Sequence, residues 1–216
     1  TIGVVSGVLG IRWFDCTVTG MEAHAGPTPM ALRKDSLLAA TRIMQDVVAA
    51  AHRHPPHGRG TVGMVQVFPN SRNVIPGRVK FSIDLRNSTD ALVDQMADEV
   101  KAFASKVGQE HGVDVKIEMV SSYPAQIFHS DCVDAVDRAA KKLGYSNMPA
   151  VSGAGHDAVY MAKLAPSGMI FIPCKDGISH NEIEDAKPEH ITAGCNVLLH
   201  AMLERALTLE RVSAQS

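Results

Sequence analysis

His180 is one polar residue of this sequence whose surroundings are typical of metal chemistry. It lies in GISHNEIED, between an apolar segment and an acidic run, where the end of a strand can present a ligand. A zinc-type site takes three or four ligands, so one histidine cannot hold a catalytic ion by itself. Most single histidines in polar loops are not ligands. His180 is therefore a candidate metal ligand that needs partners from other segments.

Two further candidates lie in loops punctuated by proline and glycine. His24 lies in GMEAHAGPTPM between two alanines, which allow another backbone to come close. Its imidazole could donate a hydrogen bond to a developing oxyanion, although an ordinary surface histidine is the commoner case. Asn73 lies in PNSRNVIPG, where an asparagine is usually a turn former. Each signal is weak when taken alone.

The remaining candidates stand at the ends of expected secondary-structure elements. Arg86 closes the strand FSIDLR on its polar face, where a guanidinium can bind a carboxylate through two hydrogen bonds. A solvated charge at a strand end is an equally good explanation. Gly155 and His156 lie in SGAGHD at the start of a helix, where free backbone N–H groups favour an anion. Asp157 could instead cap that helix.

The segments that carry His24, Asn73 and Arg86 follow the order β-α-β-β-α-β from residue 11 to about 122. Apolar residues alternate in the strands, whereas they recur at helical spacing in the two helices. This order predicts a ferredoxin-like domain, an antiparallel sheet with two helices on one face. The expected strands are 11–20, 61–68, 78–86 and 113–120, and the expected helices are 35–51 and 88–112.

The pattern changes after this region. Helices are expected near 130–143 and 188–209, and apolar runs occur around Val151 and in GMIFIPC. Such alternation predicts an α/β layer with a parallel sheet, the C-terminal part of a larger domain. These strands are too few for a stable open sheet, so we expect further strands upstream of Thr1. The absence of an initiator methionine and of a signal-peptide pattern agrees with a chain that is a piece of a longer protein.

Composition narrows the class of protein. The 216 residues are 45% hydrophobic and 20% charged, as in globular proteins with a core. A net charge of −2 gives no electrostatic reason to bind nucleic acid or a membrane surface, and no apolar run reaches the roughly 18 residues of a membrane helix. The four cysteines lack CxxC spacing, which predicts reduced thiols in a cytoplasmic protein. They are Cys16, Cys132, Cys174 and Cys195.

Five stretches together resemble one family. GMEAHAGPTPM with the following RKD, PNSRNVIPG, FSIDLR, GAGHDA and GISHNE occur in the order and spacing of M20-type metal-dependent amidohydrolases. The match is to the branch that contains N-carbamoyl-L-amino acid hydrolases, β-ureidopropionases and allantoate amidohydrolases. The resemblance implies a metal-binding α/β catalytic domain with an inserted ferredoxin-like lid that also forms a homodimer. Residues 1–10 match the last catalytic stretch before the lid, 11–120 the lid, and 121–216 the return to the catalytic domain.

The resemblance also implies roles for the candidate residues. His24 matches a lid histidine that reaches the active site of a neighbouring subunit and stabilises the oxyanion. Asn73 and Arg86 match lid residues that bind substrate, with Arg86 holding its carboxylate. Gly155 and His156 match the glycine-rich loop that lines the substrate site.

The metal site is implied only in part. His180 matches a ligand of one or two divalent ions, zinc or else manganese, cobalt or nickel. No other residue of this chain matches the remaining ligands or the glutamate that acts as general base, which belong to segments preceding Thr1. We therefore expect this chain alone to be inactive.

The implied reaction is hydrolysis of a linear carbamoyl or ureido amide that bears a carboxylate, for example an N-carbamoyl-L-amino acid to the amino acid, carbon dioxide and ammonia. Two alternatives remain open. The first is an aminoacylase or dipeptidase of the same superfamily. The second is a non-catalytic dimerisation or small-ligand module built on the ferredoxin-like domain.

Overall fold

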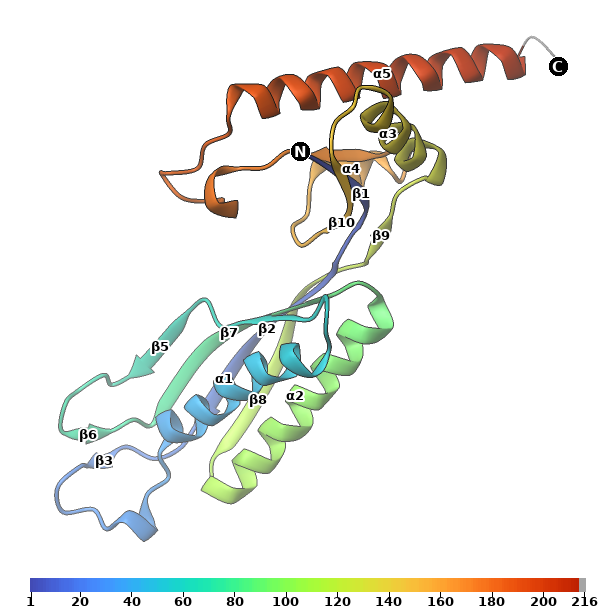
Figure 1. Cartoon of the computed structure of the whole chain (residues 1–216). Helices are drawn as coiled ribbons and strands as arrows, with labels where there is room; N and C mark the ends of the chain where they lie inside the picture. The colour runs from blue at the N-terminus through green and yellow to red at the C-terminus, as the bar shows by residue number, and fades with distance from the viewer. Residues whose placement is uncertain (214–216) are drawn as a thin grey trace. The chain divides into compact units, whose positions relative to one another are not determined.

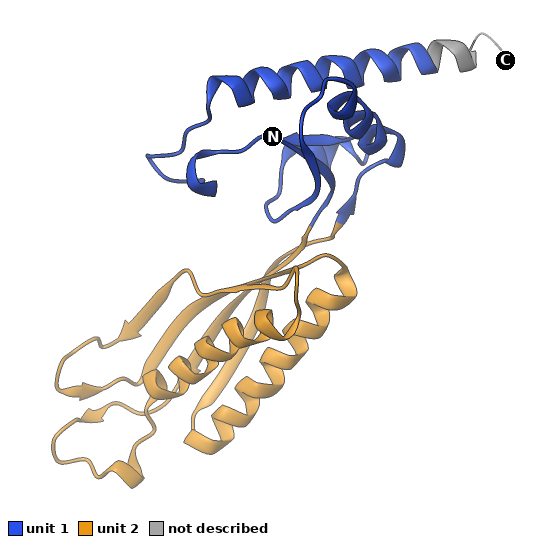
Figure 2. Ribbon diagram, viewed as in Figure 1, with its two compact units in different colours: residues 1–8, 126–216 blue, residues 9–125 orange. Residues whose placement is uncertain are grey.

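The computed structural model describes the backbone of residues 1–213 and the side chains of residues 1–208. The chain forms two compact units (Figure 2). The first, here called the ferredoxin-like unit, is Leu9–Ala125. The second, the mixed-sheet unit, combines Thr1–Val8 with Gln126–Ser216. The sequence predicts residues 11–120 for the lid, and the action of the ferredoxin-like unit as a lid remains a prediction.

The ferredoxin-like unit is an antiparallel sheet covered on one face by two helices (Figure 1). The sheet order is β4-β7-β2-β8, and β5 also pairs with β7. This is the topology predicted from the order of elements. The elements are β2 (Gly10–Thr19), α1 (Ser36–Arg53), β4 (Arg59–Thr61), β5 (Val65–Phe68), β7 (Arg78–Asn87), α2 (Asp90–His111) and β8 (Asp114–Tyr123).

One expected strand is wrong in detail. The run 61–68 is not continuous, because it divides into β4 and β5, which both pair with β7. At the break, the backbone N–H of Met64 donates to the Ser82 hydroxyl at 3.1 Å, and the Ser82 N–H donates to the Met64 carbonyl at 3.1 Å. A polar side chain on the partner strand thus replaces a ladder bond, which strand propensity alone does not indicate.

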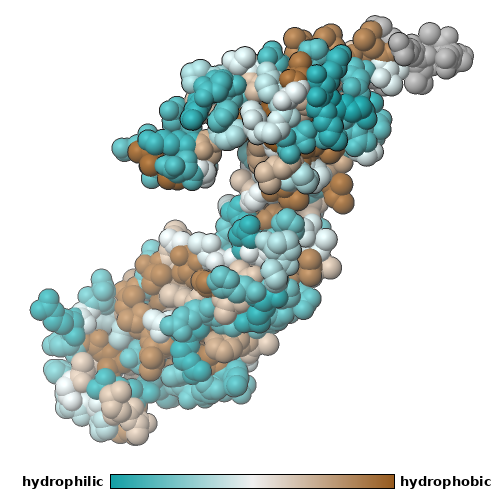
Figure 3. Space-filling model, viewed as in Figure 1, coloured by the Kyte–Doolittle hydropathy of each residue, from teal (hydrophilic) through white to brown (hydrophobic). Residues whose placement is uncertain are grey.

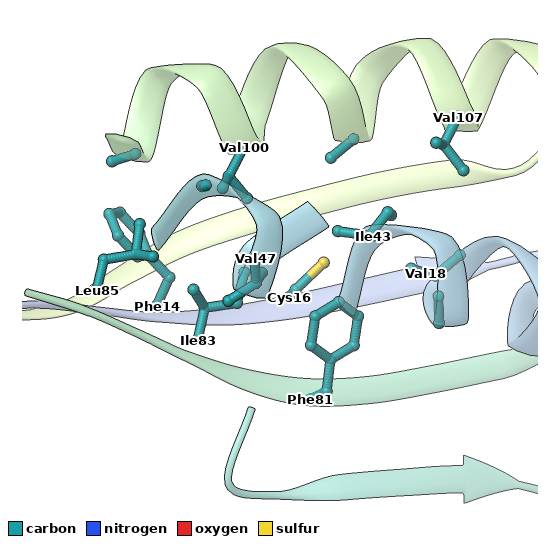
Figure 4. Packing of buried hydrophobic residues seen from close by; sticks show 14 of the residues in the cluster. Phe14, Cys16, Val18, Ile43, Val47, Phe81, Ile83, Leu85, Val100 and Val107 are labelled. Atoms are coloured by element: carbon teal, nitrogen blue, oxygen red, sulfur yellow. The ribbon is translucent and has the colours of Figure 1, made fainter. Parts of the chain in front are cut away.

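Alternation in β7 builds the core between the sheet and the helices. Four residues of this strand are at most 1% exposed, and Phe81, Ile83 and Leu85 point toward α1 and α2 (Figure 4). Full burial of a side chain of this size contributes about 2–3 kcal/mol. The four are Val79, Phe81, Ile83 and Leu85. The alternate residues, which include Lys80 and Arg86, lie on the other face.

Helix boundaries follow local capping chemistry. The Thr89 hydroxyl accepts a hydrogen bond from Leu92 N at 3.2 Å, so Thr89 is the N-cap of α2. Gly112 ends the same helix at φ 61°, a left-handed conformation that favours glycine. Asp35 caps α1 by accepting from the backbone N–H groups of Leu37 and Leu38. The chain before α1 is thereby tied to the helix start.

The mixed-sheet unit has the order β10-β1-β11, with β9 also pairing with β1. Strand β1 is parallel to β10 but antiparallel to β11 and β9, so the expectation of a parallel sheet holds for β1 and β10 and is wrong for β11 and β9. The apolar run GMIFIPC indicates burial, and burial does not specify strand direction. The elements are β1 (Ile2–Val8), β9 (Gln126–Ile127), α3 (Ser130–Lys142), β10 (Asn147–Ser152), α4 (Asp157–Met161), β11 (Met169–Phe171), η2 (Lys175–Gly177) and α5 (Pro188–Ser213).

Helix α5 has two apolar sides. One packs with α3 and β1 through the buried residues Ala193, Val197 and Ala201. The other is exposed, and brown patches interrupt the teal surface over this helix (Figure 3). An apolar groove of about 730 Å³ lies between α3, β11 and α5. No helix among the described residues is long and apolar enough to cross a membrane.

The four cysteines are all free, as their spacing predicts. Cys16 is fully buried in the core of the ferredoxin-like unit (Figure 4). Burial raises the pKa of its thiol to about 12. Cys195 on α5, by contrast, is exposed.

Candidate functional site

His24 and Asn73 lie side by side although they are far apart in the sequence. They belong to a two-stranded antiparallel sheet of β3 (Ala23–His24) and β6 (Val74–Ile75), in which His24 faces Val74. The next backbone bond runs from Ala25 N to the Asn73 carbonyl at 2.8 Å. The Asn73 side-chain oxygen accepts from the Ser71 hydroxyl at 3.0 Å. Two loops thus present an imidazole and a carboxamide on one exposed edge.

The His24 ring is held by its own loop. The backbone N–H of Gly26 donates to Nδ1 of His24 at 3.0 Å. A backbone N–H can only donate, so Nδ1 accepts and the proton of the neutral ring is on Nε2. Nε2 has no partner among the described side chains and backbone groups. The ring therefore offers one N–H donor to a ligand.

Arg86 lies at the other end of the sheet. It faces Ile11 of β2 and Arg59 of β4, whereas β3 and β6 lie beyond the end of β7 that begins at Arg78 (Figure 1). At about 3.4 Å per residue, the path from Arg78 to Arg86 spans about 27 Å. The structure therefore brings His24 and Asn73 together but does not bring Arg86 to them within one ferredoxin-like unit.

The guanidinium of Arg86 binds a carboxylate of its own strand. Its Nε donates to Asp84 Oδ1 at 2.9 Å, and its Nη2 donates to Oδ2 at 2.6 Å. The hydrogen bonds to Asp84 raise the pKa of Arg86, with partial burial acting in the opposite direction. This two-point contact is the geometry in which a guanidinium binds a planar carboxylate, here that of Asp84.

Gly155 and His156 lie in the mixed-sheet unit, in the loop between β10 and α4. The His156 Nε2 is 3.1 Å from the hydroxyl of the buried Ser152, and its ring edge meets Phe171 with centroids 5.6 Å apart. Helix α4 has only five residues, and His156 is its N-cap residue, so Asp157 is not the cap. A Cβ at Gly155 would meet nothing within 4 Å, so packing inside this chain does not require glycine there.

His180 is exposed in the loop that precedes α5, with a left-handed backbone at φ 58°. Its backbone N–H donates to Glu184 Oε2 at 3.0 Å, which ties the loop to the following acidic run. Within residues 1–208, no group of three or more histidine, cysteine, aspartate or glutamate side chains could hold a metal ion. The described side chains therefore do not make a complete site, and His180 could supply one ligand at most.

Sequence reasoning missed one residue near His24. Arg33, in the RKD stretch, donates from its guanidinium to the carbonyls of Ala25 and Thr28. The available signal was the composition of the loop: Pro27 and Pro29 have no N–H, so the usual backbone donors for its carbonyls are scarce. A basic side chain a few residues away is one way to satisfy them.

The fold and these side chains define the class of protein. A ferredoxin-like unit is inserted between two stretches of a mixed α/β unit, and polar candidate residues lie at both ends of the inserted sheet. The family model described as Peptidase family M20/M25/M40 matches residues 17–204. The chain belongs to this family.

Similar proteins indicate which branch of the M20 family the chain resembles. The chain is 46% identical over 209 residues to an N-carbamoyl-L-amino-acid amidohydrolase of Rhizobium meliloti, covering 97% of this chain and 50% of the relative. It is 31% identical to an allantoate amidohydrolase of Bacillus subtilis, covering 95% of this chain and 50% of that protein. A crystal structure of a hydantoinase/carbamoylase family amidase from Burkholderia multivorans has 52% identity and a TM-score of 0.92, over 95% of this chain and 50% of that one. The chain spans about half the length of these relatives.

Proposed function

We propose that this chain is part of an enzyme that hydrolyses N-carbamoyl-L-amino acids to the amino acid, carbon dioxide and ammonia. The main support is its 46% identity to a relative named for that reaction, over nearly the whole chain. The relatives named allantoate amidohydrolase act on a ureido compound by their names, so the shared chemistry is a linear carbamoyl or ureido amide.

In this proposal His24 stabilises the oxyanion. Attack of water on the carbamoyl carbonyl places negative charge on its oxygen, and the Nε2–H of His24 is a donor with no other partner among the described groups. One such donor contributes on the order of 3 kcal/mol to the transition state in comparable hydrolases. The backbone of Asn73 pairs with Ala25, the residue next to His24, and in this proposal the Asn73 carboxamide binds the substrate.

Arg86 binds the substrate carboxylate. Its guanidinium already makes a two-point contact with Asp84, and a substrate carboxylate would compete for or share the same donors. A carbamoyl amino acid is only a few ångströms long between its two functional groups. Arg86 and His24 are separated by a path of about 27 Å along β7. One substrate molecule is too short to contact both residues of the same chain.

The two ends of one sheet consequently serve two different active sites. We propose a homodimer in which each site takes Arg86 from one chain and His24 with Asn73 from its partner. A surface for such pairing is available on β8, because this ten-residue strand pairs only with β2 among the described strands. An open edge strand can bind another chain through backbone hydrogen bonds.

The metal-dependent part of the reaction belongs to the complete protein. M20 family amidohydrolases generally depend on a divalent metal, and such an ion polarises the carbonyl and activates water. We propose that His180 supplies one ligand to zinc, manganese, cobalt or nickel. The other ligands and the general base come from outside this chain, and Gly155 with His156 lines the substrate site. We expect this chain to be inactive by itself. We expect the complete enzyme to act in the cytoplasm.

A substrate panel tests the proposal. The complete protein, supplied in turn with each of the four metals, is assayed on an N-carbamoyl-L-amino acid, its D-enantiomer, allantoate, an N-acetyl amino acid and a dipeptide. The proposal predicts the highest kcat/KM on the N-carbamoyl-L-amino acid. Preferential hydrolysis of the N-acetyl amino acid or dipeptide would assign an aminoacylase or dipeptidase. No hydrolysis of any substrate with any metal would favour a binding module.

A further inference from the structure

The loop that carries His24 is closed by side chains that the proposed reaction does not use. Arg33 follows the 3₁₀ turn η1 (Met30–Leu32), which leads out of the loop. Its Nη2 donates to the Ala25 carbonyl at 2.7 Å and to the Thr28 carbonyl at 3.0 Å, while its Nε donates to the Thr28 carbonyl at 3.2 Å. One guanidinium thus joins the start of the loop to its end.

Thr28 makes the second closure. Its hydroxyl donates to the carbonyl of His24 at 2.6 Å, which fixes the peptide immediately before Ala25. Both carbonyls of the His24–Ala25 dipeptide are therefore held by side chains of the same loop or its exit. The next residue, Gly26, is the one whose N–H donates to the imidazole. Displacement of this dipeptide would remove the Gly26 N–H from Nδ1.

The geometry of this contact favours arginine. Nε and Nη2 are fixed in one plane, so a single side chain can bind two carbonyls that belong to different peptides. A lysine ammonium is a point charge without that planar fork. Among the described residues, no carboxylate forms an ion pair with Arg33, which agrees with a guanidinium used for backbone carbonyls rather than for charge pairing.

We propose that Arg33, with Thr28, is a positioning residue that holds His24 with Nδ1 as acceptor and Nε2–H directed to a ligand. Its place in catalysis depends on the proposed function, but the positioning itself does not. The role of Arg33 is to act through the loop rather than to touch the substrate. In the RKD stretch, Arg33 thus has a structural role in the His24 loop, and Asp35 has another as the N-cap of α1.

Nuclear magnetic resonance on the 216-residue chain tests the positioning directly. Two-bond ¹H–¹⁵N correlation of the His24 imidazole reports the tautomer at a pH where the ring is neutral, with the signal assigned by its loss in His24→Gln. Hydrogen exchange of the Gly26 amide reports the bond to Nδ1. The variants are Arg33→Met, Arg33→Lys and Thr28→Val, and Lys34→Met is the control because it removes one charge from the adjacent residue.

The wild-type chain and Lys34→Met are expected to have a single Nε2–H tautomer and a protected Gly26 amide. In Arg33→Met and Arg33→Lys, the tautomers should mix and Gly26 should exchange about tenfold faster. Thr28→Val, which removes one bond, should show the same change to a smaller extent and covers the case in which the Arg33 variants do not fold. Unchanged tautomer and exchange in folded variants would overturn the inference, and so would full restoration by lysine.

In the complete enzyme, Arg33→Met should lower kcat while KM changes little, because the substrate does not contact Arg33. If the His24 resonance changes as expected but the complete protein hydrolyses no carbamoyl substrate, the proposed function fails and the positioning stands. An active enzyme whose His24 resonance does not respond to Arg33 would overturn the positioning and leave the proposed function in place.

Discussion

Mixing two impaired variants should restore activity if the proposed arrangement of active sites is correct. His24→Ala removes the oxyanion donor and should lower kcat/KM by about 10²–10³. Arg86→Ala removes a charged hydrogen-bonding partner of the substrate and should lower kcat/KM by about 10–10², mainly through KM. Neither side chain lies in the hydrophobic core, so both variants should fold.

The expected recovery follows from the positions of the two residues. Because they lie at opposite ends of β7, a dimer of one His24→Ala chain and one Arg86→Ala chain has one site with both defects and one site with neither. Random exchange of subunits makes about half of the dimers mixed, so total activity should reach about a quarter of the wild-type value. If the two residues served the same site from one chain, every site would be defective.

The assay is ammonia release from an N-carbamoyl-L-amino acid by the complete protein, before and after joint unfolding and refolding of the two variants. Lys80→Met is the matched control, because Lys80 lies on the same face of β7 and makes only an exposed ion pair with Asp15 at 2.9 Å. Mixing Lys80→Met with either variant should give the average of the two activities. Activity of the His24→Ala and Arg86→Ala mixture that stays at the level of the single variants would refute the shared-site reasoning.

Three further predictions concern the ferredoxin-like unit and the thiols. Phe81→Ala should lower the free energy of unfolding by about 3–5 kcal/mol in denaturant titration, because the ring is 1% exposed; a loss below about 1 kcal/mol would contradict the packing. Gly112→Ala should destabilise by about 1 kcal/mol because of its φ of 61°, whereas Gly63→Ala, with nothing nearer than 3.8 Å to its added Cβ, should have little effect. At about pH 8 a thiol reagent should modify the exposed Cys195 rapidly, but Cys16 only on unfolding, since a pKa of about 12 leaves almost no thiolate; equal rates would contradict its burial.

Local signals predicted much of the ferredoxin-like unit. Alternation in β7 identified the face that is buried, because one buried face requires a period of two. The bounds 88–112 expected for the second helix agree with α2, which Thr89 caps and Gly112 ends, because capping depends on nearby atoms. The topology then follows from the order of elements.

Features that depend on distant residues were not predictable in this way. The direction of β11 depends on where the chain re-enters the sheet, and its apolar composition is the same for either direction. The interruption between β4 and β5 depends on Ser82 of another strand. The pairing of His24 with the Asn73 loop, and the separation of both from Arg86, depend on the register of β3, β6 and β7.

The structure contains different amounts of the expected surroundings of the six candidate residues. His24 and Asn73 lie close together in the backbone, whereas Arg86 lies at the opposite end of β7, so the proposed site takes Arg86 from a second chain. His180 and the Gly155–His156 loop are exposed, and the partners that would complete their sites do not lie among the described residues. Their roles remain predictions.

The most direct test of the central claim is the rate of ammonia release from an N-carbamoyl-L-amino acid by the metal-loaded complete protein, compared with its His24→Gln variant. Glutamine keeps a side-chain donor of similar reach but loses the imidazole held by Gly26. The proposed mechanism predicts rapid release by the wild type and a fall in kcat of at least about tenfold in the variant. Equal rates in the two proteins, or no release from the wild type, would contradict it.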